Sequence, residues 1–158
     1  MNDKVRLSLT QRSQSSLAGV GSDAAQPKTR LLLVEDCTDL ADATAEFLRR
    51  MGLEVCIAES GKEALETAPA FRPDIIVCDM CLPDMSGVDA ARGFRANRET
   101  SNAVLAICTA MAVVEIRSIK DELCPHDVDL VISKPITTGQ IQKLIGMSAA
   151  KTANLPRT

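Results

Sequence analysis

Short apolar runs alternate with longer amphipathic segments through the central part of this chain. The apolar runs are rich in Val, Ile and Leu at successive positions, which is typical of strands covered by helices on both faces of a parallel sheet. Five strands are therefore predicted, at Leu31–Val34, Val55–Ala58, Ile75–Cys78, Val104–Cys108 and Leu130–Ile132.

Helical patterns occupy the segments that follow these runs. The first has apolar or small residues at helical spacing, and Gly52 follows it as a natural helix stop. The second begins where Ser60 and Glu63 fit a capping box, in which two side chains satisfy free N–H groups at the helix start. The predicted stripes and helices are Leu40, Ala43, Thr44, Phe47, Leu48 and Met51 in the first, Ala64, Leu65 and Ala68 in the second, and then Val88–Ala96, Val113–Leu123 and Thr138–Met147.

Five strands alternating with five helices predict a doubly wound α/β domain around a five-stranded parallel sheet. The preceding residues, 1–28, are rich in Ser, Gln, Gly and Ala and predict a flexible N-terminal tail. The domain is expected to occupy residues 29–147, followed by a C-terminal tail over residues 148–158. Neither an internal repeat nor a second domain is expected.

Composition narrows the functional classes. The 158 residues are 46% hydrophobic and 25% charged with a net charge of −3, as in an ordinary globular domain. This charge disfavours direct nucleic-acid binding, and three Phe without Trp or Tyr exclude an aromatic platform for single strands. The apolar runs are too short to span a membrane and the N-terminus lacks a signal-peptide pattern, so a cytoplasmic protein without membrane contact is expected.

Six cysteines are present, and several lie inside the apolar runs, where a reduced thiol packs as a small hydrophobic group. Cys78 and Cys81 have the spacing of a redox motif, but they bracket a strand end, so a core cysteine and a loop cysteine are favoured. Cys37 and Cys81 each follow acidic residues, and a redox role for this pair stays open. Zinc is disfavoured because the single histidine, His126, is expected in a surface loop.

Polar residues follow all five predicted strands, and those after four of them suggest chemistry, whereas Glu59 and Ser60 after the second strand suggest none. Ligands of an open parallel sheet bind at the carboxyl ends of the strands. Carboxylates gathered there repel one another, and a hard cation such as Mg²⁺, which prefers oxygen ligands, relieves the repulsion. A neighbouring ammonium and hydroxyl are suited to phosphoryl oxygens, so this set predicts a phosphoryl group on Asp79, the central carboxylate. The strand-end residues are Glu35 and Asp36, then Asp79, then Thr109, and finally Lys134.

In order and spacing, this set resembles the receiver domain of two-component response regulators, over residues 30 to about 147. The matching stretches are Val34-Glu35-Asp36, the loop from Asp79 through Pro83 to Gly87, Thr109-Ala110 and Lys134-Pro135. The resemblance implies the flavodoxin-like receiver fold and a stand-alone module similar to single-domain chemotaxis regulators. It also implies a monomer or weak dimer that is phosphorylated by a histidine kinase or phosphotransfer protein and signals by contact with a downstream protein.

By this resemblance, Asp79 is the phosphoacceptor, Lys134 pairs with it and then with its phosphate, and Thr109 hydrogen-bonds the phosphoryl group. The peptide bond before Pro135 is expected to be cis, since a bond preceding proline has only a small trans preference. Such proteins catalyse their own phosphorylation and a slow dephosphorylation without being dedicated enzymes. The implied Mg²⁺ ligands are Glu35, Asp36, Asp79 and the backbone carbonyl of Cys81.

The switch and loop positions depart from the commonest family pattern. Val131 stands where an aromatic residue is usual, so only a modest rearrangement is expected. It should run from Thr109 through Ala110 and Met111 to an output face on the fourth helix, fifth strand and fifth helix. Cys81 and Met111 flank the phosphate without an amide or carboxylate to hold an attacking water, so a long-lived phosphorylated form is expected.

An aspartate-nucleophile phosphohydrolase is the alternative, because such enzymes also use Asp, Mg²⁺, Thr and Lys. They usually carry two Asp residues two positions apart after the first strand, whereas Glu35-Asp36-Cys37 stands there in this chain and Asp79 follows the third strand. A flavin carrier is a third possibility, but it would need a hydroxyl-rich phosphate loop after the first strand and aromatic flanks, which the sequence does not supply there.

Overall fold

One sheet of five parallel strands organises the domain, in the order β2-β1-β3-β4-β5. The computed structural model describes residues 27–110 and 126–154 of the chain. Each predicted run lies inside an observed strand, so the predicted α/β fold with a doubly wound parallel sheet is confirmed. The strands are β1 (Arg30–Val34), β2 (Glu54–Ala58), β3 (Ile75–Asp79), β4 (Val104–Thr109) and β5 (Leu130–Ser133).

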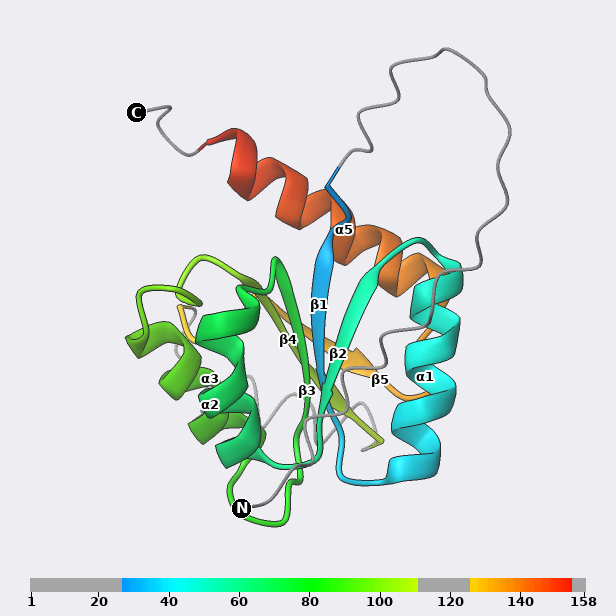
Figure 1. Cartoon of the computed structure of the whole chain (residues 1–158), viewed down its shortest axis with the longest axis vertical. Coiled ribbons are helices and arrows are strands. Elements are labelled where there is room, and N and C mark those ends of the chain that lie inside the picture. Colours follow the sequence, from blue (N-terminus) through cyan, green and yellow to red (C-terminus); the bar gives the residue numbers. More distant parts are fainter. Residues whose placement is uncertain (1–26, 111–125, 155–158) are drawn as a thin grey trace, which may run out of the picture.

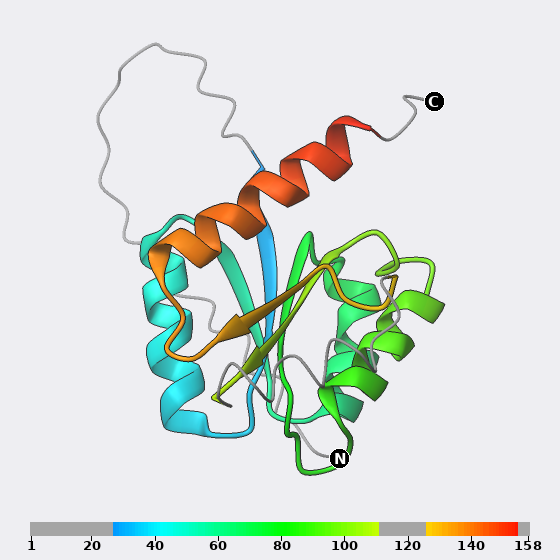
Figure 2. The same ribbon diagram turned by 180° about the vertical axis from the view of Figure 1, so that it is seen from behind.

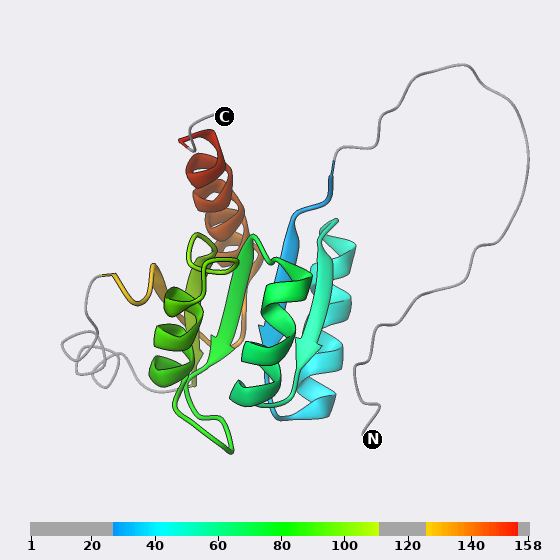
Figure 3. The ribbon, with the colours of Figure 1, turned by 60° about the vertical axis from the view of Figure 1, so that its left-hand side comes forward.

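Helices cover both faces of the sheet. Figures 1 and 3 show α2 and α3 on one side, and Figure 2 shows α1 and α5 on the other. Gly52, with φ +90°, follows α1 as predicted. The predicted helix over Val113–Leu123, and residues 1–26 of the predicted N-terminal tail, lie outside the described residues. The helices are α1 (Thr38–Arg50), α2 (Gly61–Phe71), α3 (Gly87–Ala96) and α5 (Thr138–Ala153). None of them is both long and apolar enough to cross a membrane.

Two apolar cores result, one on each face of the sheet. Side chains from α2 and α3 fill the first, where Phe94 is the largest fully buried side chain. Side chains from α1 and α5, among them Leu48 and Leu144, fill the second. Successive residues of β1 serve different cores, Leu32 the first and Leu33 the second, because side chains alternate along a strand. Burial on both faces explains the continuous apolar runs in the sequence.

The apolar stripe predicted for α1 is only partly correct, because Leu48 is buried and Phe47 and Met51 pack, partly buried, against the second core. The buried residues of this helix are Ala41, Ala45 and Leu48, and only Leu48 belongs to the predicted stripe. Alanine side chains let the helix approach the sheet closely, and close packing there decides which face is buried. The larger Leu40 and Phe47 consequently lie on the flank of the helix, with Leu40 42% exposed.

The predicted end of the last helix at Met147, with a tail from Ser148, is also wrong. Helix α5 continues through residues 148–153, and Ser148 is buried. The extension is held from outside the helix, because the Lys151 ammonium lies 2.9 Å from a carboxylate oxygen of Asp129, just before β5. This contact with a distant residue stabilises the extension, and no local sequence signal predicts it.

The capping box predicted at α2 is half correct. The Ser60 hydroxyl accepts a hydrogen bond from the backbone N–H of Glu63 at 3.2 Å. The Glu63 carboxylate, however, accepts from the N–H of Glu59 at 2.9 Å, one residue before the expected donor. A complete box is found instead at α5, where Thr137 and Gln140 cap each other's backbone N–H groups.

Candidate functional site

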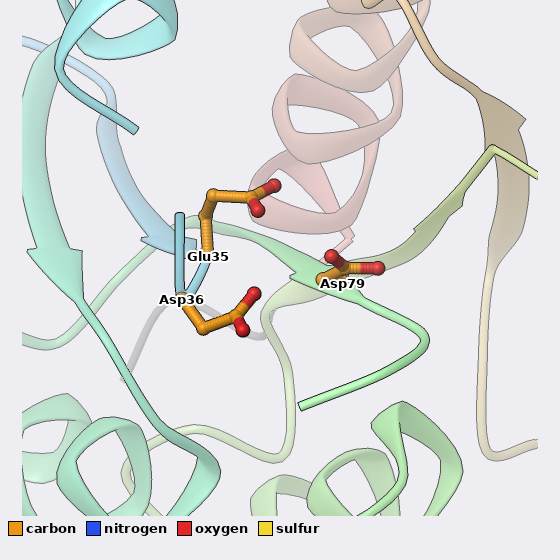
Figure 4. Close-up of side chains that lie close together, drawn as sticks. All are labelled: Glu35, Asp36 and Asp79. Atoms are coloured by element: carbon orange, nitrogen blue, oxygen red, sulfur yellow. The ribbon is translucent and has the colours of Figure 1, made fainter. Parts of the chain in front are cut away.

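Three carboxylates meet at the carboxyl edge of the sheet. Residue Val34 of β1 pairs with Cys78 of β3, so Glu35 and Asp79 follow side by side where these two strands end. Oxygens of Glu35, Asp36 and Asp79 all lie within 4.8 Å of one another, and Figure 4 shows the first two coming from the end of β1 and the third from β3. Glu35 is buried, Asp79 is half-buried and Asp36 is exposed, so the cluster is open to solvent on one side.

A single lysine bridges two of these carboxylates. The Lys134 ammonium lies 2.6 Å from Oε2 of Glu35 and 2.8 Å from Oδ2 of Asp79. Its backbone N–H donates to the Thr109 carbonyl at 2.9 Å, and the following bond to Pro135 is cis, as predicted. Burial alone would lower the lysine pKa, but the hydrogen bonds and negative charges of Asp79 and Glu35 outweigh it and raise the pKa. The lysine is therefore held as a cation.

The loop after β3 folds back on its own start. The N–H of Cys81 donates to Oδ1 of Asp79 at 3.3 Å, and Cys81 pairs with Ser86 across the loop. The N–H of Gly87 donates to the Met80 carbonyl at 2.8 Å, and a Cβ at Gly87 would lie only 2.5 Å from the Asp79 carbonyl oxygen. Glycine at this position therefore allows α3 to start directly against the acceptor strand.

The remaining predicted positions lie along β4 and β5. Thr109 is buried at the end of β4 and pairs with Ser133, next to the lysine. Val131 is half-buried in β5 and pairs with Ile107, while Ala110 is exposed. Met111 lies outside the described residues. The predicted lifetime of the phosphorylated form, which depends on Met111 and Cys81, stays a prediction.

The cysteines divide as the sequence predicted. Burial raises the pKa of both Cys78 and Cys108 to about 12, so these thiols stay protonated core side chains near neutral pH. Cys37 and Cys81 are free and exposed near the ends of β1 and β3. His126 is exposed in a turn, as predicted.

A groove that the sequence reading missed begins at the site. This cavity of about 210 Å³ has Glu35, Asp79 and Lys134 among its lining residues. Its walls are mainly apolar side chains of α1 and of the β5–α5 connection: Leu40, Ala43, Phe47, Pro135 and Ile136. Leu40 and Phe47 belong to the stripe predicted on α1, and the exposed Leu40 and half-buried Phe47 form one wall of the groove on the flank of this helix. A large apolar residue in the first helical turn was the only available signal.

The donor set fits a divalent cation of the magnesium type. Three carboxylates face a single lysine, which leaves an excess of negative charge, and every carboxylate oxygen is a hard ligand. The exposed side at Asp36 leaves room for the waters that Mg²⁺ normally keeps. Within residues 27–110 and 126–154, no other group of three or more acidic, Cys or His side chains is close enough to hold a metal ion.

Comparison with known proteins gives a family-model match. The model of the response regulator receiver domain matches residues 31–146. The DNA-binding response regulator MtrA of Mycobacterium tuberculosis is 34% identical over 70 residues, which are 44% of this chain and 31% of MtrA. A response regulator receiver protein of Anaeromyxobacter is 44% identical over 66 residues, 42% of this chain and 28% of that protein. The chain thus spans about a third of the length of these curated relatives.

Solved structures agree in fold. The receiver domain of the sensor histidine kinase PA1611 from Pseudomonas aeruginosa, with magnesium coordinated in its active-site cleft, has a TM-score of 0.67 and 26% identity. The match covers 78% of this chain and 99% of that one. The chemotaxis protein CheY4 of Vibrio cholerae has a TM-score of 0.66 and 22% identity, over 76% and 98% of the two chains.

Proposed function

The chain belongs to the response regulator receiver family, and from this premise we propose that Asp79 accepts a phosphoryl group from a histidine kinase or phosphotransfer protein. The observation that carries the proposal is the Lys134 ammonium, which reaches the carboxylates of both Asp79 and Glu35 at the carboxyl edge of the sheet. A carboxylate paired to a lysine and clustered with two further acids suits a phosphoryl acceptor in a Mg²⁺-dependent reaction.

The transfer follows from these groups. A carboxylate oxygen of Asp79 forms the bond to phosphorus as the phosphorus–nitrogen bond of the phosphohistidine breaks, and the imidazole leaves with the electron pair and takes up a proton. Lys134 compensates negative charge on the phosphoryl oxygens, and the Thr109 hydroxyl donates to one of them. Glu35, Asp36, Asp79 and the carbonyl of Cys81 would hold Mg²⁺, which would supply further charge compensation when bound.

A small phosphodonor tests this function against the phosphohydrolase alternative. A receiver should gain one phosphoryl group per chain when Mg²⁺ is present and none after chelation, as intact-protein mass reports. The same preparation should release inorganic phosphate from a small phosphomonoester no faster than the Asp79→Asn variant does. Rapid turnover that depends on Asp79 would favour the phosphohydrolase instead.

Removing one carboxylate should weaken Mg²⁺ binding sharply. Ligand charge sets the affinity of such sites, so we expect Asp36→Ala to bind Mg²⁺ at least tenfold more weakly, about 1.4 kcal/mol. Calorimetric titration of the metal-free protein measures this directly. Asp39→Ala, an exposed acid in the first turn of α1, is the matched control. Equal affinities for wild type and Asp36→Ala would place the metal elsewhere.

We also propose that the phosphodonor protein docks in the groove beside the site. A partner that delivers a phosphoryl group to Asp79 must approach this edge of the sheet, and the apolar walls run from Asp79 and Lys134 to the exposed Leu40. An apolar anchor on the partner would bury its surface there. The groove is therefore continuous with the reacting carboxylate, as a donor interface requires.

The variant Leu40→Ser separates docking from chemistry. A few central residues carry most of the binding energy of an interface, and truncating one of them costs about 2 kcal/mol or more. With Leu40 as such a residue, transfer from the cognate kinase should slow at least about tenfold. Labelling by a small phosphodonor should be unchanged, because Leu40 is not part of the acceptor set. Arg50→Ser, at the exposed opposite end of α1, should affect neither rate. Equal kinase-dependent rates for wild type and Leu40→Ser would remove the groove from the interface.

We also propose that the surface that contacts the downstream protein lies on β5 and α5. Val131 lies in β5, which is an edge strand, and α5 follows directly from Lys134 and Pro135. A phosphoryl group that binds Lys134 and Thr109 would first affect the connection between β5 and α5. The small Val131 side chain suits a modest rearrangement at this surface.

A further inference from the structure

The loop that follows the acceptor strand is fastened to a different helix. Oδ1 of Asp84 accepts a hydrogen bond from the N–H of Gly61 at 2.9 Å, and Oδ2 accepts from the N–H of Lys62 at 2.8 Å. These are the first two residues of α2, and the Ser60 hydroxyl takes the N–H of Glu63. Asp84 thus supplies, from 23 residues away, the caps that α2 lacks in its own sequence.

Apolar contacts reinforce the attachment. The side chains of Met80, Leu82 and Met85 all pack against the core beneath α2 and α3. Met85 lies so close to Gly61 that a Cβ there would be 2.4 Å from its Cγ. The hydrogen bond from the backbone N–H of Lys62 is the main reason why the pKa of Asp84 is lowered, so its carboxylate is ionised when it caps the helix.

The other end of the same loop reaches the acceptor. Cys81 donates its N–H to Asp79, and its pairing with Ser86 closes the loop two residues beyond Asp84. The loop is therefore a short closed piece of backbone, attached to Asp79 at its base and to α2 at its tip.

We propose that Asp84 is a positioning residue for the metal, because it fastens the loop to α2 and thereby fixes the direction of the Cys81 carbonyl. This inference rests on the proposed Mg²⁺ site. With the tip released, the carbonyl must be ordered when the ion binds, and that ordering reduces the affinity. Linkage requires the reverse effect as well, so Mg²⁺ should tighten the contact between Asp84 and α2.

The test compares two caps of one helix. Groups that orient metal ligands typically change metal affinity by about tenfold or more, so Asp84→Ala should bind Mg²⁺ about tenfold more weakly. Ser60→Ala also removes a cap of α2, but the Ser60 side chain does not contact the loop. The Mg²⁺ affinity of this variant should therefore stay within about twofold of wild type. Asp84→Asn keeps one acceptor oxygen and should lie between wild type and Asp84→Ala.

Amide hydrogen exchange gives a second readout that needs no activity. Adding Mg²⁺ to the wild-type chain should slow exchange at Gly61 and Lys62, and the effect should vanish in Asp84→Ala. Equal Mg²⁺ affinities for wild type and Asp84→Ala, or an equal loss in Ser60→Ala, would overturn the inference while leaving the proposed function intact. A wild-type chain that binds no Mg²⁺ would overturn both.

Discussion

Asp79→Asn should abolish labelling of the chain by a small phosphodonor in the presence of Mg²⁺. The amide has no nucleophilic carboxylate oxygen, so no acyl phosphate forms, and the metal loses one of three carboxylates at the same time. The fold should persist, because Lys134 keeps its 2.6 Å contact with Glu35 and the crowding of acids is relieved. Intact-protein mass after incubation measures the labelling, and circular dichroism verifies the fold.

Two controls make the Asp79 result specific. Asp39→Asn removes a negative charge from the first turn of α1, near the same edge of the sheet, and should be labelled like wild type. Lys134→Met should slow labelling strongly but not eliminate the acceptor. Undiminished labelling of Asp79→Asn would contradict the assignment of Asp79 as the acceptor. Peptide mapping of the labelled variant would then identify the residue that carries the phosphoryl group.

The second large effect concerns stability, at the opposite edge of the sheet from the acceptor. Asp129 accepts hydrogen bonds from the backbone N–H of Leu105 at 2.8 Å, from Arg95 at 2.6 Å and from Lys151 at 2.9 Å. The side chains of Arg95 and Asp129 are only 17% and 20% exposed. Arg95 also donates to the carbonyls of the segments before β4 and β5. The acid thus joins α3, β4 and α5.

Asp129→Ala should lower the free energy of unfolding by about 2–3 kcal/mol, because it leaves Arg95 and Lys151 without their negative partner and the Leu105 N–H without its acceptor. Urea unfolding followed by circular dichroism measures the change. Glu46→Ala breaks an exposed pair with Arg50 within α1 and should cost less than about 0.5 kcal/mol. A cost for Asp129→Ala as small as that of the control would mean that the network contributes little.

The contribution of Asp129 to the free energy of unfolding should decrease as the pH is lowered. Burial alone would raise the pKa of this carboxyl, but the Leu105 N–H, Lys151 and Arg95 outweigh burial and lower the pKa. A depressed pKa in the folded state stabilises the fold above the unfolded value of about 4, and this stability is lost as the pH falls through the folded value. The stability difference between wild type and Asp129→Ala should therefore be constant near neutral pH and narrow below about pH 4.

Local patterns were sufficient for the strands and for most of the site. Runs with apolar residues on both faces predict buried parallel strands, and all five predicted runs lie inside observed strands. The acids, Thr109 and Lys134 could be placed together because the carboxyl ends of parallel strands meet at one edge of the sheet. Chain order and periodicity contain that information without any knowledge of helix packing.

Helix faces and ends were less predictable. Leu40 fitted an apolar stripe on α1, yet the small residues Ala41 and Ala45 face the sheet, because close approach outweighs the larger side chain. Helix α5 was predicted to end at Met147 but continues to Ala153, where the ion pair between Lys151 and Asp129 stabilises the added turn. In each case the local sequence was compatible with more than one buried helix face or helix end, and contacts with other elements determined which one formed.

The sequence by itself determined the α/β fold and the identity of the acidic cluster, because these follow from periodicity and strand order. Only the tertiary structure decided which side chains share partners. Lys134 and Glu35 are 99 residues apart, Arg95 and Asp129 are 34 apart, and Asp84 reaches α2 across 23 residues. Such pairs depend on how loops turn and how helices pack on the sheet, and those choices are made by the free energy of the whole packed domain, which no local window of sequence contains.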